Sequence, residues 1–127
     1  MEDPSSSSSK AIRVKIEPGI CGFGCVIEVH KKARYAVSLQ VAESDCKHVR
    51  RLFQNLHEMT MRDLFSPISK NPIFLSAQKA GCHPSCPIPV AALKGVEVAM
   101  EMALPRDVTI RFGSRKSKKT HGSDSSL

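Results

Sequence analysis

Residues 35–56 of this chain read YAVSLQVAESDCKHVRRLFQNL, and the hydrophobic period changes within this stretch. Across residues 35–41 every second side chain is a larger apolar or aromatic one, which is typical of a half-buried strand. Across residues 49–56 the apolar side chains fall at i, i+3, i+4 and i+7, which predicts an amphipathic helix. Ser44 or Asp45 is the expected N-cap of that helix. A strand followed directly by a helix therefore organises the middle of the chain.

Two further strands are predicted before this stretch. Apolar and charged residues alternate across residues 12–16, and Pro18 with Gly19 ends that strand. Residues 26–30 read as a second strand, and the polar residues 31–34 link it to the third. Because three consecutive strands with short links pair most simply with their neighbours, we expect a three-stranded antiparallel meander.

Helices are predicted to follow the meander. A short helix begins at Thr60, another spans residues 72–80 after an Asn71 N-cap, and an apolar one spans residues 87–103. Alternation resumes at residues 108–112, which we expect to form a closing C-terminal strand. Strands and helices are thus segregated along the chain, which predicts an α+β fold with the helices packed on one sheet face.

The composition predicts one folded domain between two tails. Residues 1–10 are Ser-rich and residues 113–127 are basic, so we expect both to be disordered and residues 11–112 to form the domain. Although the net charge is +7, no aromatic residue is interleaved with the basic run, so nucleic acid is not the expected partner. No apolar stretch approaches the length of a membrane span, and the first residues lack the features of a signal peptide. We therefore expect a cytoplasmic protein that does not enter a membrane.

Five cysteines lie beside predicted turns or helix starts, where a sulfur can reach a ligand. In a reducing compartment, clustered cysteines bind metals or do chemistry more often than they form structural disulfides. Helix N-termini and glycine-rich turns supply N–H groups that favour a thiolate. These properties suit a soft metal or an iron–sulfur cluster. The residues concerned are Cys21, Cys25, Cys46, Cys82 and Cys86.

The cysteine spacing leaves alternatives open. Both local pairs have the form Cys-x-x-x-Cys, so neither a zinc ribbon nor a thioredoxin-type redox motif is present. Cys46 is equally well explained as a buried first-turn residue. Cys82 and Cys86, close to three prolines, are harder to explain by packing. His83 is interpreted as a solvated loop residue.

The chain resembles a small uncharacterised, cysteine-containing domain family of anaerobic archaea and bacteria. The resemblance rests on residues 20–23, residues 44–46, residues 82–89 and the segment Ala-Leu-Pro-Arg-Asp-Val at 103–108. It extends over nearly all of residues 11–112 and implies no activity. In the family pattern the recurring cysteines correspond to Cys21, Cys46, Cys82 and Cys86, whereas Cys25 is peculiar to this chain.

The placement of the cysteines is also similar to that in U-type iron–sulfur cluster assembly scaffolds. Those scaffolds have a three-stranded meander followed by helices, and cysteines at positions that match Cys21, Cys46 and Cys86. This chain has Phe23 where the scaffolds have an aspartate, and it lacks their Leu-Pro-Pro-Val-Lys segment. The resemblance therefore implies a similar arrangement of thiols.

From these observations we expect a protein that binds a metal or an iron–sulfur cluster. The predicted ligands are Cys21, Cys46, Cys82 and Cys86, and the cofactor is an iron–sulfur cluster or zinc. The expected role is scaffold, carrier or redox partner, with protein partners that donate or accept a cluster, rather than that of an enzyme. The alternatives are a structural zinc site in a partner-binding module and a thiol–disulfide redox protein that uses Cys82 and Cys86.

Overall fold

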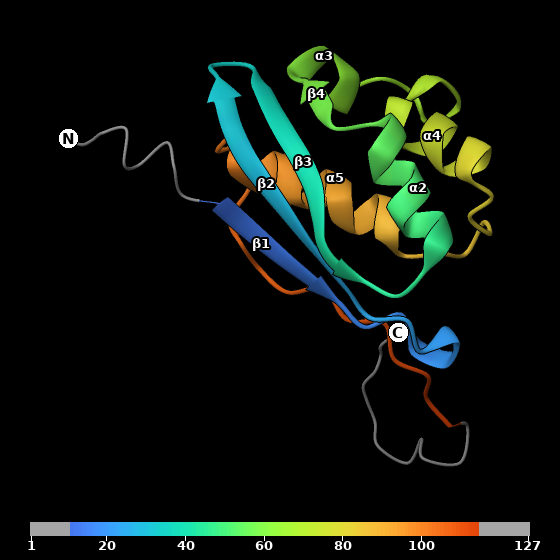
Figure 1. Ribbon diagram of the computed structural model, residues 1–127. Coiled ribbons are helices and arrows are strands. Elements are labelled where there is room, and N and C mark those ends of the chain that lie inside the picture. The colour runs from blue at the N-terminus through green and yellow to red at the C-terminus, as the bar shows by residue number, and fades with distance from the viewer. Residues whose placement is uncertain (1–10, 115–127) are drawn as a thin grey trace.

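The computed structural model describes residues 11–114, which form one sheet and several helices (Figure 1). The predicted tails, residues 1–10 and 113–127, lie outside the described residues except for positions 113 and 114. The elements in chain order are β1 (Ala11–Ile16), η1 (Gly19–Cys21), β2 (Cys25–Ala33), β3 (Ala36–Ser44), α2 (Lys47–Asn55), β4 (Glu58–Thr60), α3 (Met61–Leu64), η2 (Ile68–Lys70), α4 (Pro72–Ala80) and α5 (Ile88–Ala99).

The sheet is antiparallel and has the strand order β1-β2-β3-β4. The predicted α+β class and the meander of the first three strands are confirmed. A two-residue turn at Arg34 and Tyr35 joins β2 to β3, because Ala33 pairs with Ala36. The fourth strand was not predicted, since three residues are too few to show a period of two.

One face of the sheet is buried and the other faces solvent. Side chains of β2 and β3 such as Ile27, Val29 and Val37 are fully buried. On the open face Arg13 and Gln40 both bind Glu28. Helix α5 packs against β1 and β2, and α2 packs against β3 and α4 (Figure 1).

The ends of the middle helices follow the local sequence as predicted. Thr60 and Asp63 form a reciprocal capping box at the start of α3. Asn71 caps α4 by accepting a hydrogen bond from the Ile73 N–H, and Gly81 ends α4 in the left-handed conformation. The predicted cap of α2 is wrong, because Cys46 itself is the N-cap residue and neither Ser44 nor Asp45 takes that position.

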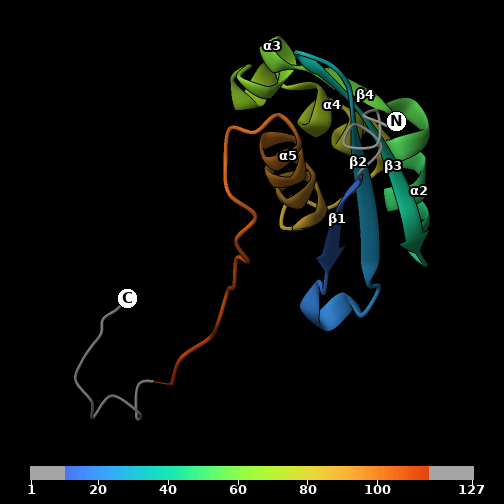
Figure 2. The same cartoon turned by 90° about the vertical axis from the view of Figure 1, so that its left-hand side faces the viewer.

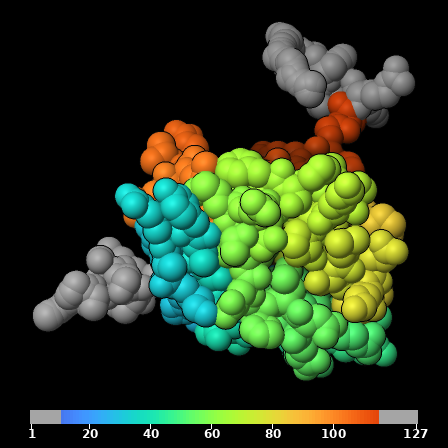
Figure 3. All heavy atoms as spheres, turned by 90° about the horizontal axis from the view of Figure 1, so that it is seen from above, coloured from blue at the N-terminus to red at the C-terminus, as the bar shows by residue number. Residues whose placement is uncertain are grey.

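The predicted closing strand is absent from the part of the chain that the structure describes. Helix α5 ends at Ala99 rather than near residue 103, and residues 104–112, here called the C-terminal arm, carry no strand assignment. The arm runs away from the body (Figures 2 and 3). Alternating apolar residues show that a segment can be a strand. To form a strand, the segment must also hydrogen-bond to the edge of a sheet, and the local sequence does not indicate whether such an edge is within reach.

Candidate functional site

The five cysteines come from four separate segments that meet at one end of the sheet. Cys21 ends η1, Cys25 begins β2, Cys46 caps α2, and Cys82 and Cys86 lie in the α4–α5 connection. Figures 1 and 2 show η1, the start of α2 and the α4–α5 connection at this same end. All five are free cysteines. We call this arrangement the cysteine cluster.

The cysteines differ in burial. Cys21 is exposed, whereas Cys25 is 3% exposed and belongs to the hydrophobic core. Cys46, Cys82 and Cys86 are half-buried and pack against that core. The cluster therefore extends from the core to the surface, with Cys21 at its open end.

Hydrogen bonds fix Cys46 at the junction between β3 and α2. Its N–H donates to the Ser44 hydroxyl at 3.1 Å, and its carbonyl accepts from the Arg50 N–H at 3.1 Å. The Arg50 guanidinium also donates to the Ser44 carbonyl at 2.7 Å. Ser44 thus orients Cys46 without itself becoming the N-cap.

Cys82 is positioned by a contact between α2 and α4. The carbonyl of Ala80 accepts hydrogen bonds from His48 Nδ1 at 3.0 Å and from the Arg51 guanidinium at 3.3 Å. Gly81 follows with a φ of +86°, and a Cβ placed there would lie 3.2 Å from His48 Nδ1. A glycine is therefore required for both conformation and space, and the chain then turns directly into Cys82.

Cys86 lies just before α5. Its N–H donates to the His83 carbonyl at 3.0 Å, and its sulfur is hydrogen-bonded by the backbone N–H of Ile88. Burial raises the pKa of the Cys86 thiol, the Ile88 N–H lowers it, and negative charge on Cys46 and Cys21 raises it. The Ile88 N–H belongs to the first turn of α5, so this helix start supplies a donor to the sulfur.

Burial and negative charge on neighbouring cysteines both raise the pKa of Cys25, Cys82 and Cys86. Burial, together with negative charge on Cys86 and Cys46, raises the pKa of Cys82 to about 11. The same causes, opposed by a hydrogen bond from Ser44, raise the pKa of Cys25 to about 11. Cys21 and Cys46 in turn act on Cys86. The raised pKa values favour the neutral thiol at Cys25, Cys82 and Cys86.

The cysteine cluster is not closed around a single point. Among residues 11–114, no three His, Cys, Asp or Glu side chains are arranged so that they could hold one metal ion. The four predicted ligands thus share one end of the fold without the close packing that a mononuclear site needs.

Sequence reasoning missed two features of this region. Cys25 was set aside, yet its thiol is hydrogen-bonded by Ser44 and senses charge on Cys46 and Cys86. His48 was not singled out, yet it joins α2 to the end of α4 through the Ala80 carbonyl. No sequence signal could reveal that contact, because its partner carbonyl lies 32 residues away. His83 is exposed, as predicted, and its Nδ1 lies 3.1 Å from the Ser85 hydroxyl.

Comparison with known proteins identifies the family of this chain. Residues 12–112 match a family of unknown function (DUF6951), and the chain therefore belongs to that family. No curated protein and no solved structure matches the chain. None of the described helices is long and apolar enough to cross a membrane.

Proposed function

We propose that this protein binds an iron–sulfur cluster, or another soft metal centre, through Cys21, Cys46, Cys82 and Cys86. It would act as a scaffold, carrier or redox partner that exchanges its cargo with other proteins. The observation that carries the proposal is that these cysteines come from separate segments to one end of the sheet, where, in addition to burial, charge on Cys46 and Cys21 raises the pKa of Cys86, and charge on Cys86 and Cys46 raises that of Cys82. Thiolates are the ligands that soft metals and iron–sulfur clusters prefer.

We prefer an iron–sulfur cluster to a single zinc ion because of the different ligand spacings that the two require. Four thiolates around one zinc each lie about 2.3 Å from it, so any two sulfurs are roughly 4 Å apart. No described group of three ligand side chains meets that requirement. In a [4Fe–4S] cluster each of the four cysteines binds a different iron atom, so the ligands lie farther apart than around one zinc ion. A structural zinc site remains the first alternative.

The thiol pKa values weigh against the second alternative, a dithiol redox protein. Thiol–disulfide exchange requires a thiolate, and redox cysteines usually have lowered pKa values. Burial instead raises the pKa of Cys82 to about 11 and raises that of Cys86. A metal centre does not meet this obstacle, because coordination itself displaces the proton.

The open side of the cysteine cluster suits the transfer of a cargo. Cys21 is exposed, and Ile20 beside it is fully exposed, so a donor protein could reach this thiol first. A depression of about 630 Å³ at the same end of the sheet is lined by charged side chains such as Lys15, Glu17 and Asp45. Its charged lining differs from the mostly apolar pockets that hold small-molecule substrates. This supports a binding role over an enzymatic one.

The test is anaerobic reconstitution of the full chain with ferrous iron and sulfide. Bound iron, sulfide and zinc are then measured together with the visible absorption spectrum. We expect iron and sulfide to be retained in near-equal amounts, with charge-transfer absorption from sulfur to iron. Zinc binding alone would support the structural zinc site, and a protein that retains no metal would refute both metal proposals.

Matched serine variants separate ligands from packing residues. Cys46→Ser and Cys86→Ser should each abolish retention of iron and sulfide, because oxygen is a poor replacement for a soft thiolate. Cys25→Ser is the control, since serine is close in volume and Ser44 remains available as a hydrogen-bond partner. It should retain the cofactor. Equal loss in all three variants would make Cys25 a ligand, and full retention in Cys46→Ser and Cys86→Ser would refute the proposed site.

A further inference from the structure

The C-terminal arm is an exposed, extended segment with the pattern of a strand. Its apolar side chains alternate from residue 108 onward, and each of them is exposed to solvent. The exposed fractions are 81% for Leu104, 62% for Val108, 79% for Ile110 and 98% for Phe112. The match to the family extends to residue 112 and so includes the whole arm. Since so much exposed apolar surface is unusual on a monomer, the arm is expected to have a binding partner.

Strand β1 has an outer edge without a partner among residues 11–114. The sheet order is β1-β2-β3-β4, and β1 pairs only with β2. An edge strand of this kind offers a row of N–H and C=O groups to any extended segment. Ile12 and Val14 on β1 are half-buried and pack against the core, so an added strand could extend the buried face.

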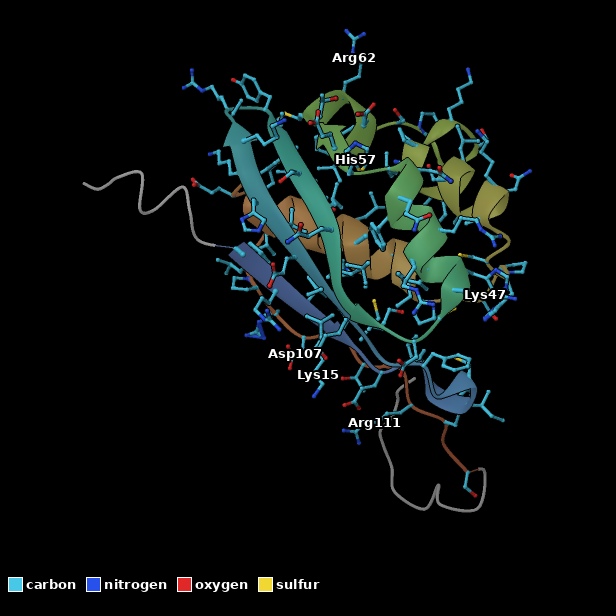
Figure 4. All side chains as sticks on the ribbon, in the orientation of Figure 1. Lys15, Lys47, His57, Arg62, Asp107 and Arg111 are labelled. Carbon is cyan, nitrogen blue, oxygen red and sulfur yellow. The ribbon has the colours of Figure 1, made fainter. Side chains whose placement is uncertain are left out.

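The arm and β1 are complementary in one particular alignment. If they run parallel with Val108 opposite Val14, then Ile110 lies opposite Ile16, and apolar residues share one face. The same alignment places Asp107 near Arg13 and Arg111 near Glu17, so both charged pairs have opposite signs. Figure 4 shows the side chains of Asp107 and Arg111 projecting away from the body.

Antiparallel alignments fit less well. With Val108 opposite Ile16, Asp107 would face Glu17 and Arg111 would face Arg13, and both pairs would be repulsive. A shift by two residues removes the repulsion and places Asp107 opposite Lys15, but it forms this one charged pair only. Phe112 extends past β1 in both this alignment and the parallel one. The parallel alignment is preferred because it forms two charged pairs of opposite sign, the second of them with Glu17, which directly follows β1.

We propose that two copies of this chain exchange their C-terminal arms, each arm adding as a parallel strand to the outer edge of β1 of the other copy. The path of the arm favours exchange over pairing within one chain. Glu101 has a φ of 62°, in the left-handed region, and its carboxylate lies 3.7 Å from Lys31 Nζ. The chain turns out of α5 at this residue, and the arm then runs away from the sheet of the same copy (Figure 2). Nine residues span about 30 Å when fully extended, which is enough to reach a neighbouring copy. Two-fold symmetry would form the same pairing twice.

The test measures the mass of the full chain by analytical ultracentrifugation in the micromolar range. A reductant and a chelator exclude dimers joined by disulfides or metals, so the result does not depend on the proposed function. We expect twice the monomer mass of 13.9 kDa. Deletion of residues 104–127 should give a monomer, and deletion of residues 114–127, which keeps the arm, should leave the dimer intact.

Point variants test the pairing itself. Ile110→Glu should raise the dimer dissociation constant at least about tenfold, because it buries a charge against the partner's apolar residues. Thr109→Glu adds the same charge to the opposite face of the arm and should change the constant by less than about threefold. Arg111→Glu should weaken the dimer, and adding Glu17→Arg should restore it.

The following results would contradict arm exchange or one part of it. A monomeric full chain, or a dimer that persists without the arm, refutes arm exchange. Equal effects of Ile110→Glu and Thr109→Glu refute an apolar face on the arm. Tighter association of Arg111→Glu refutes the parallel alignment, since only the antiparallel one places two arginines opposite each other. Faster amide exchange in β1 on arm deletion from a monomer would show pairing within one chain.

Discussion

Replacement of Gly95 by alanine tests how closely α5 approaches the sheet. A Cβ at this position would lie 2.8 Å from Val14 Cγ2 and 3.2 Å from Val29 Cγ2. Carbon atoms in contact prefer separations of about 3.5–4.0 Å, so the methyl group cannot be accommodated without movement. Val29 is fully buried, and valine side chains have few rotamers to choose from, so neither neighbour can easily turn aside.

Two opposing effects set the size of the change. Alanine stabilises a helix interior by about 1 kcal/mol relative to glycine. Overpacking a well-filled core costs about 1–3 kcal/mol, and the shorter of the two distances places this site toward the upper end of that range. We therefore expect Gly95→Ala to lower the free energy of unfolding by about 1–2 kcal/mol.

Urea unfolding followed by far-ultraviolet circular dichroism, in the presence of a reductant, measures this change. The control is a double-mutant cycle with Val14→Ala, which removes the nearest methyl group. Gly95→Ala should cost at least about 1 kcal/mol less in the Val14→Ala background than in the natural chain. If Gly95→Ala stabilised the protein, or cost the same in both backgrounds, α5 would not pack this closely on β1.

Three further predictions follow from other parts of the fold. Asn71→Ala should lower the free energy of unfolding, measured by urea unfolding, by about 2–3 kcal/mol. Asn71 is 2% exposed, its side chain caps α4, and its side-chain amide donates to backbone carbonyls, so the alanine variant loses all of these hydrogen bonds. Stability should fall as the pH rises from about 9 to about 11, since burial raises the pKa of Cys25 from 9.0 to about 11 and the folded state then binds more protons than the unfolded state. Cys25→Ala should flatten this fall in urea titrations across that range, and an unchanged fall would contradict the burial of the thiol. Gly81→Ala should cost more stability than Gly22→Ala, because both have positive φ but only Gly81 has His48 3.2 Å from the added Cβ; equal costs would argue against that contact.

Local chemistry explains which parts of the fold were predictable. The meander, the capping box at Thr60, the Asn71 cap and the Gly81 end of α4 each depend on residues close together in the sequence. The cap of α2 was misassigned because Ser44, Asp45 and Cys46 are all able to take that place, and the hydrogen bond between Ser44 and Cys46 decides among them. Strand β4 was missed because it depends on β3 for its hydrogen bonds.

The sequence alone determined the identity of the candidate ligands and their positions next to turns and helix starts. It could not determine which other cysteines act on the pKa of Cys86, or that Cys25 is buried. Those relations depend on contacts such as that of His48 with the Ala80 carbonyl, which join segments far apart in the chain. The C-terminal arm illustrates the same limit. Alternation determines that residues 108–112 are able to form a strand, whereas only the tertiary structure decides whether an edge is within reach, because a strand requires hydrogen bonds from outside itself.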